Sequence, residues 1–277
     1  MLKAILHAYI RRRRPLRDHS FLVLPHLGLA YGRCPNSASE DIRQALLRLT
    51  AGSGGVPFDT DDFEDDETED VTGAETETET ETEPEAGDDA CAYATGTLAS
   101  WADGLNLLSG RQLMRRHPGA LVFSVVRDPL TRLAACFHRM RTEAAPPPGA
   151  DRAFRPDDDF AGFVARVCAL PDWKSPNAYR SQTAILTHKA RLLPTRLLRH
   201  ETGEADWQGL RADLAHACGI DIGPLPGIAE PHGEAIAALV GEIEPVLRLA
   251  VRRRYAADYR NFYEGTSLAL PAIGASG

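Results

Sequence analysis

Two short segments of the sequence combine residue types that bind phosphate or sulfate groups. Residues 33–39 (RCPNSAS) include small hydroxyl residues that let backbone amides approach an anion. Residues 127–129 (RDP) follow an apolar run and begin with Arg127, whose guanidinium can donate two parallel hydrogen bonds to a phosphate. Arg132 follows one helical turn later, where it can reinforce that contact or pair with Asp128. These segments predict a site for an anionic ligand.

Each segment lies where a predicted strand passes into a predicted helix. Residues 27–32 and 120–126 are apolar, and the second run has the pattern of a strand buried on both faces. Ser39 is placed to cap a helix over residues 39–50, and Asp128 followed by Pro129 is typical of a helix start. Ligands of parallel α/β sheets bind at the carboxyl ends of the strands, where the next helix presents free backbone N–H groups.

The rest of the chain also alternates between strand and helix patterns. We expect further strands at 21–24 and near 195–198, and helices over 101–117, 129–142, 160–170, 178–189, 205–217 and 233–256. This alternation predicts an α/β fold with a mostly parallel sheet covered by helices. No internal repeat is present, and we interpret residues 1–277 as one domain.

One acidic tract interrupts this pattern. Residues 59–89 hold 17 of the 39 Asp and Glu residues, and no Lys or Arg occurs between Arg48 and Arg111. A segment with few apolar residues and high like charge cannot bury enough surface to fold, so residues 53–92 are predicted to be a disordered insertion. The remaining chain has 22 acidic and 31 basic residues, a formal charge of +9 that favours an anionic ligand. The acidic tract could compete with an anionic ligand for a basic groove on the folded part of the chain, or it could bind a basic partner.

Several classes of protein are excluded by the composition. No run of about 18 apolar residues is present, so no transmembrane helix is expected. A signal peptide carries its positive charges before its apolar run, whereas here four arginines follow residues 1–10, so a signal peptide is not expected. Five widely spaced cysteines without a CxxC motif argue against a disulfide scaffold or a zinc site and favour a cytoplasmic location. No basic face with interleaved aromatic residues predicts nucleic-acid binding.

Residues 123–133 (FSVVRDPLTRL) resemble the 3′-phosphate-binding motif of sulfotransferases that use 3′-phosphoadenosine 5′-phosphosulfate (PAPS), in particular the carbohydrate, Golgi-type branch with its many bacterial members. The family pattern is a hydrophobic strand followed by V-R-D-P-x-x-R-x-x-S. Residues 177–182 (NAYRSQ) resemble the family's N-x-H-W-R-x-Q segment, residues 199–201 (RHE) its R-x-E strand end, and residues 255–263 its closing segment. The resemblance covers about residues 20–265, apart from the acidic insertion.

The resemblance implies a P-loop-like fold that transfers the sulfuryl group of PAPS, without a metal, to a hydroxyl acceptor such as a saccharide. Positioned cations would stabilise the charge that develops on the leaving nucleotide. By the resemblance, Arg127 and Arg132 hold the 3′-phosphate, and Arg180 lines the same groove. The residues expected at the 5′-phosphosulfate are Arg33, Asn36, Ser37 and Ser39.

The first loop departs from the family pattern P-K-x-x-S-[ST]-[ST]-I-[KR]. Aligned on Pro35, Asn36 stands at the lysine position, and Glu and Asp replace the two hydroxyl residues after Ser39. In a second register, Arg33 takes the role of the lysine and Ser37 that of the serine. We favour the first register for the structure, with Arg33 available to supply charge.

Other family positions are also replaced, and the general base is not assigned. Ala135 stands at the final serine of the second motif, and Ala178 at the histidine of the third. Asp103 is a candidate base by position alone. Three histidines, His117, His138 and His188, lie in predicted helical runs. The replacements keep a second hypothesis open: a catalytically impaired sulfotransferase-fold protein that acts by binding a nucleotide or a partner.

Overall fold

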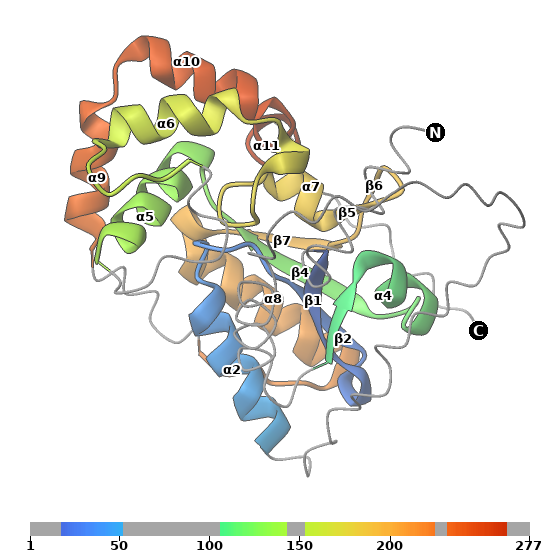
Figure 1. The fold of residues 1–277 in the computed structure, drawn as a ribbon. Helices are drawn as coiled ribbons and strands as arrows, with labels where there is room; N and C mark the ends of the chain where they lie inside the picture. Colours follow the sequence, from blue (N-terminus) through green and yellow to red (C-terminus); the bar gives the residue numbers. More distant parts are fainter. Residues whose placement is uncertain (1–17, 52–105, 143–152, 225–231, 265–277) are drawn as a thin grey trace, which may run out of the picture.

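A five-stranded sheet forms the centre of the molecule (Figure 1). The computed structural model describes residues 18–51, 106–142, 153–224 and 232–264. The strands are β1 (His19–Leu24), β2 (Leu29–Gly32), β3 (Asn106–Ser109), β4 (Leu121–Val126) and β7 (Arg196–Arg199), in the order β3-β1-β2-β4-β7. Parallel pairs join β2 to β4 and β4 to β7, whereas β1 is antiparallel to both of its neighbours. Four of the five strands therefore run in the same direction, and the predicted mixed α/β class is confirmed.

Helices flank the sheet and extend beyond one end of it. They are α2 (Ser39–Ala51), α4 (Gly110–Arg116), α5 (Pro129–Thr142), α6 (Phe160–Ala169), α7 (Gln182–Leu186), α8 (Gly203–Cys218), α9 (Gly233–Glu242), α10 (Pro245–Arg254) and α11 (Ala256–Phe262). Short 3-10 helices cover Pro25–Leu27, Asp172–Lys174 and His200–Thr202. A separate hairpin consists of β5 (Thr187–His188) and β6 (Arg191–Leu192). No helix in the described ranges is long and apolar enough to cross a membrane.

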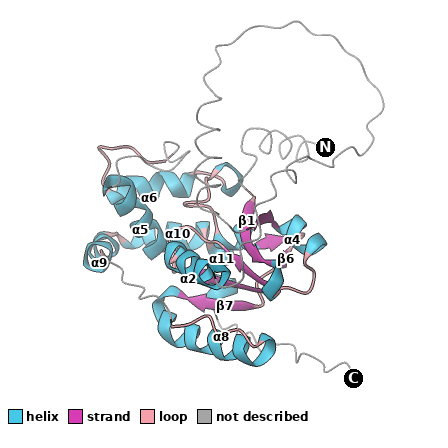
Figure 2. Cartoon of the chain, turned by 90° about the horizontal axis from the view of Figure 1, so that it is seen from below, coloured by secondary structure: helices cyan, strands magenta, loops and turns pink. Residues whose placement is uncertain are grey.

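Alternate residues of the strands build a core on each face of the sheet. On one face, Leu22 and Leu24 pack with Phe123 and with apolar residues of α2 and α8. Figure 2 shows α8 lying along β7 on this side. On the other face, Phe21 and Val23 pack with residues of α4 and α7. The period of two in a strand sends successive side chains to opposite faces, so the four apolar residues of β1, residues 21–24, support both cores.

A third core holds the helices beyond the sheet together. The inner faces of α5, α6, α9 and α10 meet there. Phe137 of α5 lies at its centre, with ring centroids 5.5 Å from Phe160 and 5.4 Å from Phe163. This helical layer fixes α5 relative to α6 and the segment that follows it, which matters because Arg132 on α5 reaches into the site.

Local patterns correctly predicted three of the four elements next to the two loops. The helix expected over 39–50 is α2, and the strand expected over 120–126 is β4. Asp128 accepts a hydrogen bond from the Thr131 backbone N–H at 3.0 Å and thereby caps α5, as predicted. Asp159 caps α6 in the same way through Gly162.

Four expectations about secondary structure were wrong. The predicted helix over 101–117 is α4 preceded by the strand β3, which pairs with β1, and Ser109 caps α4. The strand expected over 27–32 begins only at Leu29, after a 3-10 turn in which Gly28 has φ +60°. The helix expected over 178–189 is confined to α7, so His188 lies in a hairpin and not in a helix. Residues 233–256 form two helices, because Ile243 and Glu244 are extended before Pro245. The acidic insertion, residues 53–92, and Asp103 lie outside the described residues.

Candidate anion-binding site

The two loops singled out in the sequence lie side by side at the carboxyl edge of the sheet. The first loop, residues 33–38, follows β2, and the second, residues 127–128, follows the parallel neighbour β4. Arg127 Nη1 donates to the Asn36 carbonyl oxygen at 3.4 Å, and Arg132 Nε donates to the Pro35 carbonyl oxygen at 3.0 Å. One small ligand can therefore contact both loops.

The backbone of the first loop has the alternating shape of an anion-binding nest. Asn36 has φ +63° and Ala38 has φ +55°, whereas Ser37 between them does not have a positive φ. Such alternation turns successive backbone N–H groups toward one concavity, as in phosphate-binding loops. Within the described residues, the backbone N–H groups of residues 36–39 donate no hydrogen bond. The loop thus offers four adjacent donors at the start of α2.

Arg132 ties the first loop to the segment that precedes α7. Its side chain is buried, and besides Pro35 it contacts three carbonyl oxygens through Nη2: those of Asn177 at 2.9 Å, Ala178 at 3.2 Å and Arg180 at 2.8 Å. No carboxylate of the described chain lies within ion-pair distance of Arg132. Its charge therefore stays positive and buried behind the loop, while its N–H groups hold the backbone.

Gln182 joins the two loops through its side-chain amide. Its Nε2 donates to the Arg127 carbonyl oxygen at 2.8 Å, and its Oε1 accepts from the Arg127 backbone N–H at 3.0 Å. The same Oε1 accepts from Ser37 Oγ at 3.4 Å. Gln182 and Ser37 are both fully buried. The amide therefore pairs with the whole backbone of Arg127 as another peptide group would, and sets the direction in which Arg127 leaves β4.

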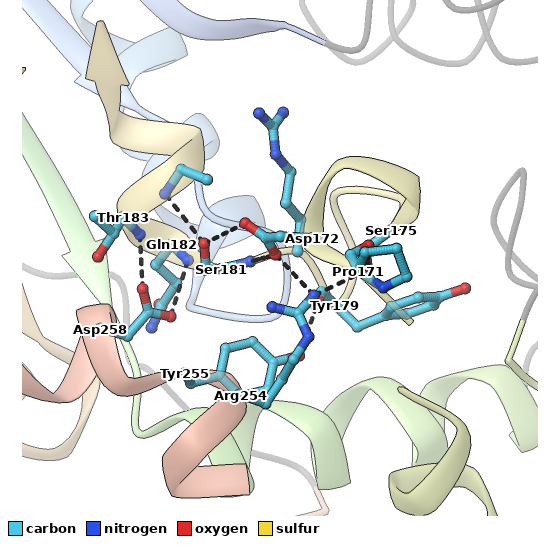
Figure 3. Close-up of polar contacts among 12 residues, drawn as sticks. Pro171, Asp172, Ser175, Tyr179, Ser181, Gln182, Thr183, Arg254, Tyr255 and Asp258 are labelled. Atoms are coloured by element: carbon cyan, nitrogen blue, oxygen red, sulfur yellow. Dashed lines mark hydrogen bonds and ion pairs between the residues drawn. The ribbon is translucent and has the colours of Figure 1, made fainter. Parts of the chain in front are cut away.

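Asp258 of α11 holds Gln182 in place from behind (Figure 3). Its carboxylate accepts the backbone N–H groups of Gln182 at 2.9 Å and Thr183 at 2.8 Å, at the first turn of α7. Burial raises the pKa of this carboxyl, while the two N–H donors and the charge of Arg132 oppose that rise. Asp258 and Arg132 thus belong to one buried polar network.

A second group of contacts fixes the segment between α6 and α7 (Figure 3). Asp172 accepts from Ser181 Oγ at 2.6 Å and from Arg254 Nη2 at 2.8 Å. Tyr255 donates its hydroxyl to the Tyr179 carbonyl oxygen at 2.5 Å. Helices α10 and α11 therefore hold residues 172–182 against the two loops, which explains how the closing segment of the chain contributes to the site.

Arg139 brings a further cation to the first loop. Its Nη1 donates to Asn36 Oδ1 at 3.3 Å, while Asn36 Nδ2 donates to the Ala178 carbonyl oxygen at 3.2 Å. The side chain of Asn36 is thus occupied by protein contacts, and a guanidinium lies directly beside it. Sequence reasoning missed Arg139, although it lies seven residues after Arg132 and so on the same face of α5.

The end of β7 completes the edge on the far side of β4. Glu201 accepts the Asp128 backbone N–H at 2.6 Å and the Tyr263 hydroxyl at 3.3 Å. The guanidinium of Arg199 lies 5.4 Å from the centre of the Tyr263 ring. Burial and the charge of Glu201 raise the pKa of the Tyr263 hydroxyl, which therefore stays protonated and donates.

The sequence matches no protein-family model and no curated protein, and no solved structure matches the chain.

The structure places the predicted site residues in three different situations. Arg127 lies between the loops and is almost fully buried. The polar side-chain atoms of Asn36, Ser37 and Arg132 contact other protein groups, so these residues shape the loop. Arg33, Ser39 and Arg180 are half-buried along the same edge; Ser39 begins α2, and Arg180 pairs with Asp18 at 3.0 Å. Within the described residues, no group of three or more His, Cys, Asp and Glu side chains is placed to hold a metal ion.

Proposed function

We propose that this edge of a P-loop-like sheet binds PAPS and that the protein is a sulfotransferase. The observation that carries the proposal is the juxtaposition of four backbone N–H groups, at residues 36–39, which have no hydrogen-bond acceptor in the described part of the chain, with the guanidinium of Arg127 at the end of the neighbouring strand. Neighbouring strands are about 5 Å apart, so a nucleotide with phosphates on both sides of its ribose can reach both loops. The four segments that resemble the sulfotransferase family also meet at this edge, which supports the same assignment.

In this proposal, the backbone of the first loop and the start of α2 bind the 5′-phosphosulfate, and Arg127 binds the 3′-phosphate. Arg33 and Arg139 supply positive charge beside the first loop. The bond between sulfur and the bridging oxygen breaks, and its electron pair stays on the 5′-phosphate. A new bond forms between sulfur and the acceptor oxygen, and the proton of the acceptor hydroxyl is released to solvent. Fixed N–H groups and guanidinium charges suit this step, because the negative charge grows on the leaving phosphate.

Titration calorimetry with adenosine 3′,5′-bisphosphate tests the binding. We expect wild-type protein to bind and Arg127→Ala to bind about 10- to 100-fold more weakly, the loss of one charge-assisted contact of roughly 1.5–3 kcal/mol. The control is Arg211→Ala, which removes an exposed ion pair to Asp221 on α8 and leaves the edge unchanged. Circular dichroism checks that both variants are folded. No binding by wild-type protein, or equal binding by Arg127→Ala, would overturn the proposal.

One observation favours a second candidate function, in which the protein binds the nucleotide without transferring sulfate. The family's lysine is replaced by Asn36, whose side chain is held by Ala178 and Arg139. Transfer of labelled sulfate from PAPS to a panel of hydroxyl acceptors separates the two functions. Transfer that is lost in Arg139→Ala, with bisphosphate binding retained, would support catalysis with Arg139 as the compensating cation. Binding of the bisphosphate without transfer to any acceptor would favour the second function.

A further inference from the structure

A basic surface lies at the same edge of the sheet, beyond the first loop. It is formed by α4 and the β5–β6 hairpin, which lie together near the β3 end of the sheet (Figure 1). The hairpin packs directly on the start of α4, because a Cβ placed on Gly110 would be 3.1 Å from the Cβ of His188. We call this the hairpin surface, and its residues are Arg111, Arg115, His188, Lys189 and Arg191.

The positive charge of the hairpin surface is not neutralised by its own elements. Residues 104–127 and 173–200, which include all of α4 and the hairpin, contain no Asp or Glu. Arg115, Lys189 and Arg191 are exposed and form no ion pair within the described chain. Partial burial and the charges of Lys189 and Arg111 lower the pKa of His188, which places these cations near one another. The surface therefore attracts anions.

The turn of the hairpin presents its lysine at a cost in backbone strain. Lys189 has φ +48° and Ala190 has φ +62°. A two-residue turn with positive φ at both positions normally carries Asn or Gly, because the β-carbon of most other residues is crowded by the following carbonyl oxygen in this conformation. Strain of this kind persists mainly at functional positions. Turn formation does not favour lysine at position 189, whereas binding of an anionic ligand would explain a lysine there.

The position of the hairpin surface relates it to the anion-binding site. Along the carboxyl edge, the order of the strands places the second loop on β4, the first loop on β2, then the start of β1, then the end of β3 and the hairpin. A nucleotide that spans β4 and β2 would have the β1 and β3 side of the sheet next to its phosphosulfate. The hairpin then lies about 10 Å beyond the first loop, two strand spacings away.

We propose that the hairpin surface binds the acceptor, and that the acceptor is a polyanionic chain that carries hydroxyl groups, such as a polyuronate. The role as acceptor rests on the proposed function, whereas the binding of the chain does not. No Phe, Tyr or Trp side chain lies on α4 or on the hairpin, so these elements lack the large aromatic platforms on which single-stranded nucleic acids stack.

Fluorescence anisotropy of a labelled polygalacturonate oligomer tests the surface. We expect the wild-type protein to bind it in a salt-dependent manner and Lys189→Glu/Arg191→Glu to bind it about tenfold or more weakly, because two attractive charges become repulsive. The matched control is Arg48→Glu/Arg155→Glu, which makes the same change of charge at two exposed residues away from the hairpin. Labelled neutral dextran should not bind any of these proteins.

Three outcomes would overturn the proposal: no binding of polygalacturonate, equal loss in both double variants, or tighter hairpin-dependent binding of single-stranded DNA of equal charge. Failure of the proposed function has a different signature. If wild-type protein fails to bind adenosine 3′,5′-bisphosphate but binds polygalacturonate through the hairpin, the surface stands and only its role as an acceptor site is lost. The double variant of the hairpin should bind the bisphosphate as wild-type protein does.

Discussion

Replacing Gln182 with methionine should destabilise the protein and weaken the anion-binding site together. Methionine has nearly the same length and favours helices, so α7 keeps its backbone hydrogen bonds to Asp258. What is lost is the pairing of the side-chain amide with the N–H and C=O of Arg127, at 3.0 and 2.8 Å. The backbone N–H and the carbonyl oxygen of Arg127 are both buried in these contacts, and the methionine side chain cannot form a hydrogen bond of comparable strength with either.

The size of the effect follows from the two unpaired groups. A buried donor or acceptor left without a partner costs about 1–3 kcal/mol, so Gln182→Met should lower the free energy of unfolding by roughly 4 kcal/mol. For a chain of this size, that corresponds to a fall in Tm of about 10 °C. The affinity for adenosine 3′,5′-bisphosphate should fall as well, because Arg127 loses the contact that directs it.

Urea unfolding followed by circular dichroism measures the change. The matched control is Gln208→Met on α8, where the glutamine is exposed and donates to Glu204, and a change within about 0.5 kcal/mol is expected. A loss below about 1 kcal/mol in Gln182→Met would refute the reasoning, because it would mean that the Arg127 peptide does not depend on this amide.

Two further predictions concern ionisable groups near the site. Burial, opposed by the charge of Arg132, raises the pKa of Cys34 to about 12, so iodoacetamide at mildly alkaline pH should leave this thiol unmodified in native protein and alkylate it in urea. Peptide mapping measures this, and alkylation at equal rates in both states would contradict it. Burial favours the neutral form of Asp172, but hydrogen bonds from Ser181 and the charge of Arg254 outweigh it and lower the pKa of the carboxyl below 3.8. The stability that Asp172 contributes is therefore present above pH 3.8 and lost as pH falls through the lowered pKa, so the difference in unfolding free energy between wild-type protein and Asp172→Asn should shrink in acid. A difference that is constant with pH would show that the charge of Asp172 does not contribute.

Local sequence patterns predicted the helix after each loop and the strand before the second loop, because their signals are local. Asp128 and Pro129 start a helix wherever the following residues favour one, and residues 120–126 are apolar enough to form a buried strand. The strand β3 was missed, because Asn106–Ser109 is only four residues long and is defined by its pairing with β1. The helical pattern of α4 also continues backwards over the residues of β3, so the sequence predicts one helix there. The Lys-Ala turn of the hairpin likewise lacks the Asn-Gly signal of such turns.

The side-chain roles within the site depend on contacts across long stretches of sequence. Gln182 meets Arg127 across 55 residues, and Arg132 meets Pro35 across 97. A motif indicates that an arginine belongs to the site, but not whether its N–H groups face a ligand or the backbone. Arg127 and Arg132 are both buried and lie five residues apart in the sequence, yet four carbonyl oxygens occupy Arg132.

These buried contacts explain how the first loop can have the backbone shape of an anion-binding nest although Asn36 stands where the sulfotransferase pattern has a lysine. The donors of the first loop are backbone N–H groups, which every residue type except proline provides. Their direction depends on the positive φ angles at Asn36 and Ala38, and these are held by Arg132 and Gln182 from outside the loop. A side chain such as the family's lysine adds charge to this shape but does not create it. A cation beside the loop can therefore come from another element, and Arg139 of α5 lies next to Asn36. Loss of the buried contacts from Arg132 and Gln182 would instead remove the shape of the loop.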